Sequence, residues 1–174
     1  MSITPIGQDE VAAAVAELVG QPFAPGTHAL DMQMFEFGVP KPWTDRKGRA
    51  RMSGDYRLHV QATWRIVSGG RIAVGDRDYS DPPTGIDDEA FDPSTGQRTL
   101  RDELLDAYHV ARTDPPRTVS AVHAETTGDL SIVFDDGSRL EIRPSGTTVE
   151  YWRLIRPDGS HIVVEHEGPT LAAP

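Results

Sequence analysis

The residues best suited to chemistry are the polar positions of one strongly alternating segment, residues 55–67. Four polar side chains alternate there with apolar ones: Arg57, His59, Gln61 and Arg65. On a strand they would share one face, about 6–7 Å apart where they are two residues apart. Asp31, on a preceding strand, would be a cross-strand neighbour of this row. Such groups on one sheet face can bind an anion or transfer protons, so we predict a ligand-binding face. The alternative is a solvated outer face of cross-strand pairs.

A second candidate surface is the acidic segment 76–97, in which Arg77 is the one basic residue. The carboxylates that we predict to contact a partner are Asp76, Asp78, Asp81, Asp87, Asp88 and Glu89. Three prolines exclude long regular structure, and a loop of this length in a compact domain is usually functional or disordered. The chain has a net charge of −10, which favours basic partners. The alternative is that this acidity only keeps the chain soluble.

Two other ligands fit parts of the chain less well. Asp76, Asp78, Ser80 and Asp87 take positions of a calcium-binding loop, but the position that requires glycine is Asp81. The segment 41–51 combines five basic residues with Trp43, a combination that binds nucleic acid, but the negative net charge opposes it. Pairing of this basic segment with the acidic one is a simpler interpretation. We therefore predict no metal, no cofactor and no nucleic acid partner.

Signatures of catalysis are missing from the sequence. The absence of cysteine excludes thiol catalysis, zinc–thiolate sites and iron–sulfur clusters. The chain has no nucleophile elbow, phosphate-binding loop or dinucleotide fingerprint. Its six histidines form no His-x-His or His-x-x-x-His pair. We therefore assign no catalytic residue and favour a non-enzymatic protein.

The elements that would position these residues predict an α+β fold, an antiparallel sheet or meander with two helices. Helices are predicted over 9–19 and 100–111, the second capped by Thr99. After an extended loop at Pro22 and Pro25, strands are predicted over 29–37, with a bulge near Met34–Phe35, and over 55–67 and 71–75. A loop is predicted over 39–54. Five strands follow, over 118–125, 130–134, 139–143, 149–156 and 161–167, with turns at 135–137 and 157–159.

The length predicts one domain, residues 1–174. Two subdomains, 1–81 and 98–167, around the acidic loop 82–97 are the alternative. The N-terminus does not read as a signal peptide, and the longest apolar stretch, Val11 to Val19, is too short to cross a membrane. We therefore expect a cytoplasmic protein that does not contact membranes.

Four segments resemble a family of small, uncharacterised bacterial proteins. They are residues 32–38 (MQMFEFG), 58–67 (LHVQATWRIV), 130–142 (LSIVFDDGSRLEI) and 151–154 (YWRL). The shared motifs are signatures of strands and hairpins, and the resemblance implies no activity. Members of this family resemble the accessory proteins that accompany bacterial toxin or secretion systems.

These observations lead to two functional hypotheses. The first is a non-enzymatic, acidic protein-binding module, such as an immunity-like or accessory protein that masks a basic partner. The second is a small-molecule-binding protein or minor enzyme that uses the polar face of strand 55–67. The second requires a cavity at that face.

Overall fold

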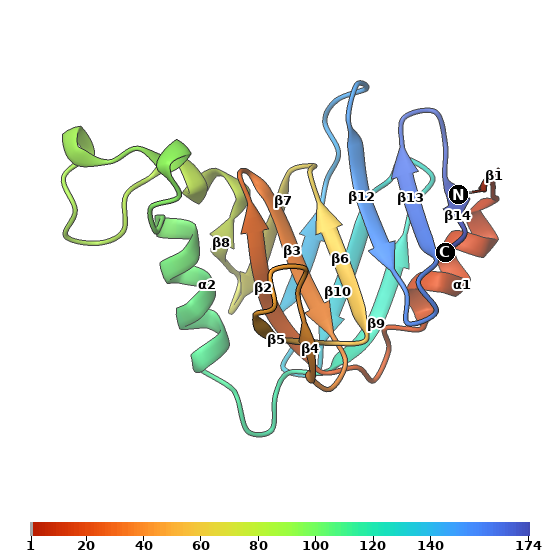
Figure 1. The fold of residues 1–174 in the computed structure, drawn as a ribbon, viewed down its shortest axis with the longest axis horizontal. Coiled ribbons are helices and arrows are strands. Elements are labelled where there is room, and N and C mark those ends of the chain that lie inside the picture. The colour runs from red at the N-terminus through yellow and green to blue at the C-terminus, as the bar shows by residue number, and fades with distance from the viewer. Residues whose placement is uncertain (1) are drawn as a thin grey trace.

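Two antiparallel β-sheets and two α-helices form most of the fold of residues 2–174, which this computed structural model describes (Figure 1). The larger sheet contains β1 (Ile3–Pro5), β2 (Phe23–Ala29), β3 (Met32–Phe37), β6 (Tyr56–Val60), β12 (Glu150–Ile155), β13 (His161–Glu165) and β14 (Thr170–Ala172). The smaller sheet contains β7 (Trp64–Ser68), β8 (Arg71–Gly75), β9 (Val119–Ala124), β10 (Leu130–Phe134) and β11 (Arg139–Ile142). The spatial orders are β1-β14-β13-β12-β6-β3-β2 and β8-β7-β11-β10-β9. The predicted α+β class is confirmed.

The hydrophobic core lies between the two sheets. Phe35, Leu58 and Leu154 of the larger sheet, and Trp64 and Ile66 of the smaller, are at most 1% exposed and belong to one buried cluster. The rings of Phe35 and Trp64 meet edge to face across the core, with centroids 5.0 Å apart, an arrangement that aromatic pairs prefer. Because the sheets face each other, their outer faces point in opposite directions. This decides where the predicted site residues lie.

The two helices lie at opposite edges of the pair of sheets (Figure 1). α1 (Gln8–Ala16) packs against β9, and α2 (Leu100–Val110) packs against β2 and β8. Both predicted helices are present, and the predicted cap of α2 is confirmed, because the Thr99 side chain accepts a hydrogen bond from the backbone N–H of Asp102. Within residues 2–174 neither helix has the length and apolar composition needed to span a membrane.

One side chain of α2, that of Arg101, is fully buried. Its Nη1 donates to the carbonyl of Asp31 at 2.9 Å, and its Nη2 donates to the carbonyl of Leu30 at 3.3 Å. Its guanidinium group lies 4.6 Å from the ring centre of Tyr79, in the 3₁₀ helix η1 (Asp76–Ser80). Arg101 therefore joins α2 to the turn between β2 and β3 and to the start of the acidic segment.

The structure corrects the prediction for residues 22–37. The predicted loop around Pro25 is part of β2, and β2 turns into β3 at Leu30, whose φ is +54°. The β3–β6 register is unbroken, so the predicted bulge on this strand is wrong; the irregularity lies on β2, between Pro25 and His28. The prediction was wrong because Gln33, a polar residue, occupies a buried position of β3 in line with Phe35 and Phe37. Its Nε2 donates to the carbonyl of Met34 at 3.0 Å, whereas its Oε1 is buried without a hydrogen-bond partner among the described residues.

Two further segments differ from the prediction. The predicted loop 39–54 contains a hairpin of β4 (Lys41–Thr44) and β5 (Ala50–Ser53). The sequence did not indicate this hairpin, because its strands pair only with each other, outside both sheets, and show no alternation of buried and exposed residues. The predicted meander is divided, with β9–β11 in the smaller sheet and β12–β14 in the larger. The predicted turns at 135–137 and 157–159 do connect β10 to β11 and β12 to β13.

Candidate functional site

The predicted strand 55–67 is two strands that belong to different sheets. β6 ends at Val60 and β7 begins at Trp64, and between them the backbone N–H of Gln61 donates to the carbonyl of Tyr151 at 3.1 Å. The apolar alternation continues through this crossing because both strands turn their apolar side chains toward the same core. The prediction of one continuous strand is therefore wrong, and its polar row is divided between two opposite outer faces.

Three of the five predicted ligand-binding residues do not join the other two on one sheet face. Asp31 lies in the turn between β2 and β3, and Gln61 is exposed at the crossing. Arg65 lies on the smaller sheet, where its Nε donates to Oε2 of Glu141 at 2.7 Å. Arg57 and His59 remain neighbours on the outer face of the larger sheet.

Two residues that sequence reasoning missed, Arg153 and His161, complete a basic cluster on this face. Arg153 lies opposite His59 in the pairing of β12 with β6. Ile155 lies opposite both Arg57 on β6 and His161 on β13. Residues directly opposite each other on paired strands point to the same face. Arg57, His59, Arg153 and His161 therefore form one group, which we call the outer-face cluster.

The two histidines of this cluster have pKa values below their usual range, which favours the neutral ring near pH 7. Burial and then the charges of Arg57 and Arg153 lower the pKa of His59. Burial and then the charges of Arg153 and Arg57 lower the pKa of His161. The Nδ1 atom of His161 lies 3.3 Å from Nη1 of Arg153. Because guanidinium nitrogens only donate, the neutral ring of His161 carries its proton on Nε2. This N–H is a donor that adds no charge.

Arg57 is the cation of the cluster that has no anionic partner. Within residues 2–174 the guanidinium group of this half-buried residue makes no hydrogen bond, and no carboxylate lies within 4.0 Å of it. Glu36 lies opposite Arg57 on β3, but its Oε2 accepts from the backbone N–H of Gly54 at 3.2 Å, and burial raises its pKa. By contrast, Arg153 donates to Glu150 through Nε and Nη2 at 3.2 and 2.7 Å. Arg57 therefore keeps its donors available for a ligand.

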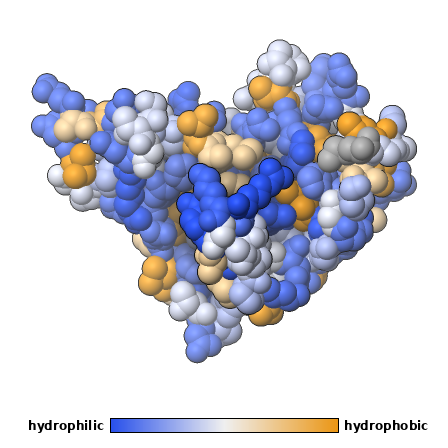
Figure 2. Space-filling model, in the orientation of Figure 1, coloured by the Kyte–Doolittle hydropathy of each residue, from blue (hydrophilic) through white to orange (hydrophobic). Residues whose placement is uncertain are grey.

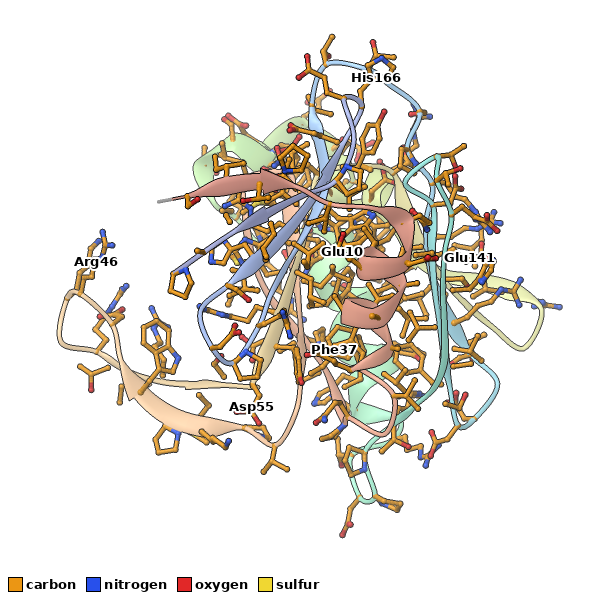
Figure 3. All side chains as sticks on the ribbon, turned by 90° about the vertical axis from the view of Figure 1, so that its right-hand side faces the viewer. Glu10, Phe37, Arg46, Asp55, Glu141 and His166 are labelled. Atoms are coloured by element: carbon orange, nitrogen blue, oxygen red, sulfur yellow. The ribbon has the colours of Figure 1, made fainter. Side chains whose placement is uncertain are left out.

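The hairpin of β4 and β5 forms a groove with the outer face of the larger sheet. Figure 3 shows the hairpin with Asp55 at its base and Arg46 at its tip, away from the sheet. Its register places Lys41 and Trp43 on the same side of the hairpin. The cavity between hairpin and sheet has a volume of about 390 Å³. Its walls include Lys41, Trp43 and Ser53 from the hairpin and Arg57, Ile155 and His161 from the sheet. We call this cavity the hairpin groove.

The hairpin tip is strongly basic and organised by one carboxylate. Figure 2 shows strongly hydrophilic residues gathered there, in front of the sheet. Asp45 accepts hydrogen bonds from the backbone N–H groups of Lys47 and Arg49, both at 2.9 Å, and from Nε of Arg49 at 2.8 Å. These bonds, that of the Arg49 backbone foremost, lower the pKa of Asp45. Within residues 2–174 no ion pair joins the hairpin to the acidic segment. The predicted pairing of the two segments is therefore wrong.

Residues 76–97 form a protrusion beside the N-terminal end of α2, which we call the acidic protrusion (Figure 1). After η1 it contains two further short 3₁₀ helices, η2 (Asp88–Ala90) and η3 (Pro93–Thr95). Asp87 caps η2 by accepting the backbone N–H of Glu89 at 3.1 Å. Among the described residues, none of the six predicted partner-binding carboxylates forms an ion pair. In the same part of the chain, no group of three or more His, Asp or Glu residues is placed to hold a metal ion.

Comparison with known proteins finds one family. A family model described as a family of unknown function (DUF6188) matches residues 45–171. The matched region contains the outer-face cluster and the acidic protrusion, whereas Lys41 and Trp43 precede it. No curated protein and no solved structure shows significant similarity to the chain. The predicted resemblance to an uncharacterised family is confirmed.

Proposed function

The chain belongs to this family of unknown function, and we propose that it is a small-molecule-binding protein whose hairpin groove holds an anionic ligand. The observation that carries the proposal is Arg57, a half-buried residue in the wall of a cavity of about 390 Å³, without a carboxylate within 4.0 Å of its guanidinium group. A guanidinium group in a groove wall with no carboxylate at ion-pair distance has donors free for a ligand. A bound anion would accept from these donors through short, charge-assisted hydrogen bonds.

The surroundings of Arg57 support an anion over a cation. Lys41 is bonded to Asp55 at 2.6 Å, so the carboxylate nearest the hairpin base is already neutralised. Arg156 also lines the groove but is paired with Glu17 at 2.6 Å, so the available donors are those of Arg57 and the N–H of His161. The cavity volume lies within the range of about 300–1,000 Å³ that is typical of small-molecule sites. In a chain with a net charge of −10, an anion needs such a local concentration of donors to bind.

The proposal predicts that Arg57→Ala weakens binding of inorganic phosphate and sulfate about 10- to 100-fold. Loss of a hydrogen bond to a charged group changes a binding free energy by about 1.5–3 kcal/mol. Calorimetric titration of both anions measures the effect. Arg71→Ala, which removes an exposed arginine from β8 of the other sheet, is the matched control and should bind as the unchanged protein does. Equal binding by Arg57→Ala, or no binding of either anion by the unchanged protein, contradicts the proposal.

A second candidate function is recognition of a basic protein by the acidic protrusion. It is favoured by one observation: Asp76, Asp78, Asp81, Asp87, Asp88 and Glu89 form no ion pair within residues 2–174. Carboxylates that no cation of the same chain compensates attract a positively charged partner and speed its association. An immunity-like or accessory protein that masks a basic partner is one version of this function.

This second function predicts that the triple variant Asp87→Asn/Asp88→Asn/Glu89→Gln loses a partner that the unchanged chain captures from native cells. Added salt should weaken the same complex, because screening reduces attraction between exposed charges. The matched control is Asp9→Asn/Asp114→Asn/Glu167→Gln, which removes three exposed carboxylates elsewhere and should retain the partner. Equal capture by both triple variants, or an affinity that does not change with salt, would count against this function.

A further inference from the structure

Trp43 is the tryptophan that the fold does not bury. It is 46% exposed, whereas Trp64 and Trp152 are 1% and 0% exposed. Within residues 2–174 its ring pairs with no other aromatic ring, and no cationic group lies over its face. It lies on the side of the hairpin that also carries Lys41, and both residues line the hairpin groove. A large flat ring in a mostly polar hairpin is thus left without a stacking partner, facing a cavity.

The opposite wall of the groove combines apolar surface with hydrogen-bond donors. Ile155 is only 8% exposed and lies in the register between Arg57 on one side and His161 on the other. The groove therefore offers an aromatic ring on the hairpin, and an aliphatic surface flanked by a guanidinium group and an imidazole on the sheet. A simple anion would use the donors and leave Trp43 in contact with water.

We propose that the ligand of the hairpin groove is a small molecule that joins a phosphate or sulfate group to a flat ring. This rests on the anion site proposed above and names the class of its ligand. The anion meets the planar donor fork of Arg57, which matches the geometry of tetrahedral oxyanions, and the N–H of His161. The ring stacks on Trp43, because an indole offers a large flat face to aromatic ligands.

Single-stranded nucleic acid carries phosphate groups and flat bases in a polymer, but the net charge of this protein disfavours binding of a polyanion. That net charge is −10, and binding of a long phosphate chain depends on many cationic contacts. The groove contains one tryptophan and a volume of about 390 Å³, whereas single-strand binding proteins stack successive bases along an extended groove. A monomeric ester is therefore the occupant that charge and size favour.

The test compares phenyl phosphate and phenyl sulfate with inorganic phosphate, inorganic sulfate and phenol. Each ester should bind at least about tenfold more tightly than its inorganic anion or phenol, since aromatic stacking contributes a factor of this order. Calorimetry measures the affinities. Quenching of tryptophan fluorescence locates the ring, because Trp64 and Trp152 are buried. Trp43→Ala should bring ester and anion within about twofold of each other, and Trp43→Phe should keep most of the preference. Met52→Ala, an exposed hydrophobic residue of β5, is the matched control and should leave all affinities unchanged.

The outcomes separate this inference from the function on which it rests. If inorganic phosphate binds through Arg57 but the ring adds no affinity, or if Trp43→Ala keeps the preference, the ligand class is wrong and the anion site stands. If neither the esters nor the inorganic anions bind, both proposals fail. If a short single-stranded oligonucleotide binds more than about 100-fold more tightly than the esters, the site recognises a polyanion, and the inference is overturned.

Discussion

Replacement of Arg101 by alanine is expected to lower the free energy of unfolding by about 3–5 kcal/mol, as losses of buried charged groups with several contacts do. The substitution removes two hydrogen bonds, to the carbonyl groups of Leu30 and Asp31, and a hydrogen bond from a charged group contributes about 1.5–3 kcal/mol. It also removes the side chain that packs on the ring of Tyr79 and leaves a cavity in a site that is fully buried. Urea unfolding followed by circular dichroism measures the change.

Two further variants separate the contributions of Arg101. Arg101→Met fills most of the volume without the hydrogen bonds, so its loss of stability should lie between that of alanine and zero. Arg77→Ala changes an exposed arginine of the same region and should stay within about 0.5 kcal/mol of the unchanged protein. A loss below about 1 kcal/mol for Arg101→Ala would mean that the cost of burying the guanidinium group, which also lowers its pKa, cancels its contacts.

Gly54→Ala is expected to displace the hairpin and to abolish anion binding in the hairpin groove. A Cβ atom on Gly54 would overlap the carbonyl oxygen of Phe37 and lie 2.7 Å from its carbonyl carbon. Phe37 is fully buried, so its backbone cannot retreat without disturbing the core. The base of the hairpin must move instead, which carries Lys41 and Trp43 away from Arg57. Overpacking of this kind also costs about 1–3 kcal/mol of stability.

The test of this prediction measures phosphate binding and unfolding on the same samples. Gly146→Ala is the matched control, because no atom lies within 4 Å of its added Cβ; it should keep both properties. The altered hairpin should appear as amide chemical-shift changes that centre on residues 38–55. A Gly54→Ala protein that binds phosphate with unchanged affinity would show that the hairpin position does not matter for the anion site.

The features that sequence predicted well depend on neighbours along the chain. Thr99 and Asp102 cap α2 because capping involves residues three apart. The turns at 135–137 and 157–159 follow from their Asp-Gly pairs. Alternation assigned Arg57 and His59 to an outer face for the same local reason.

The site was predictable only in part, because alternation tells inside from outside and does not tell one sheet from another. Arg57 and Arg65 follow one alternating pattern but lie on different sheets, since the chain crosses near Gln61 while facing a common core. For Arg153 and His161, the sequence indicated only the face of the strand on which each lies, and not which residues lie beside them. Their place beside Arg57 comes from the pairing of β12 with β6 and β13, and the first of these joins strands distant in the chain.

The sequence by itself determined the net charge, the acidic segment, both helices, several strands of the second half and the core-facing side of most residues in β6 and β7. These properties follow from composition and from contacts between near neighbours. Only the tertiary structure decided that an arginine without an ion-pair partner and an exposed tryptophan share one cavity. The physical reason is that strand order and the path of the β4–β5 hairpin depend on long-range packing, which no local pattern encodes.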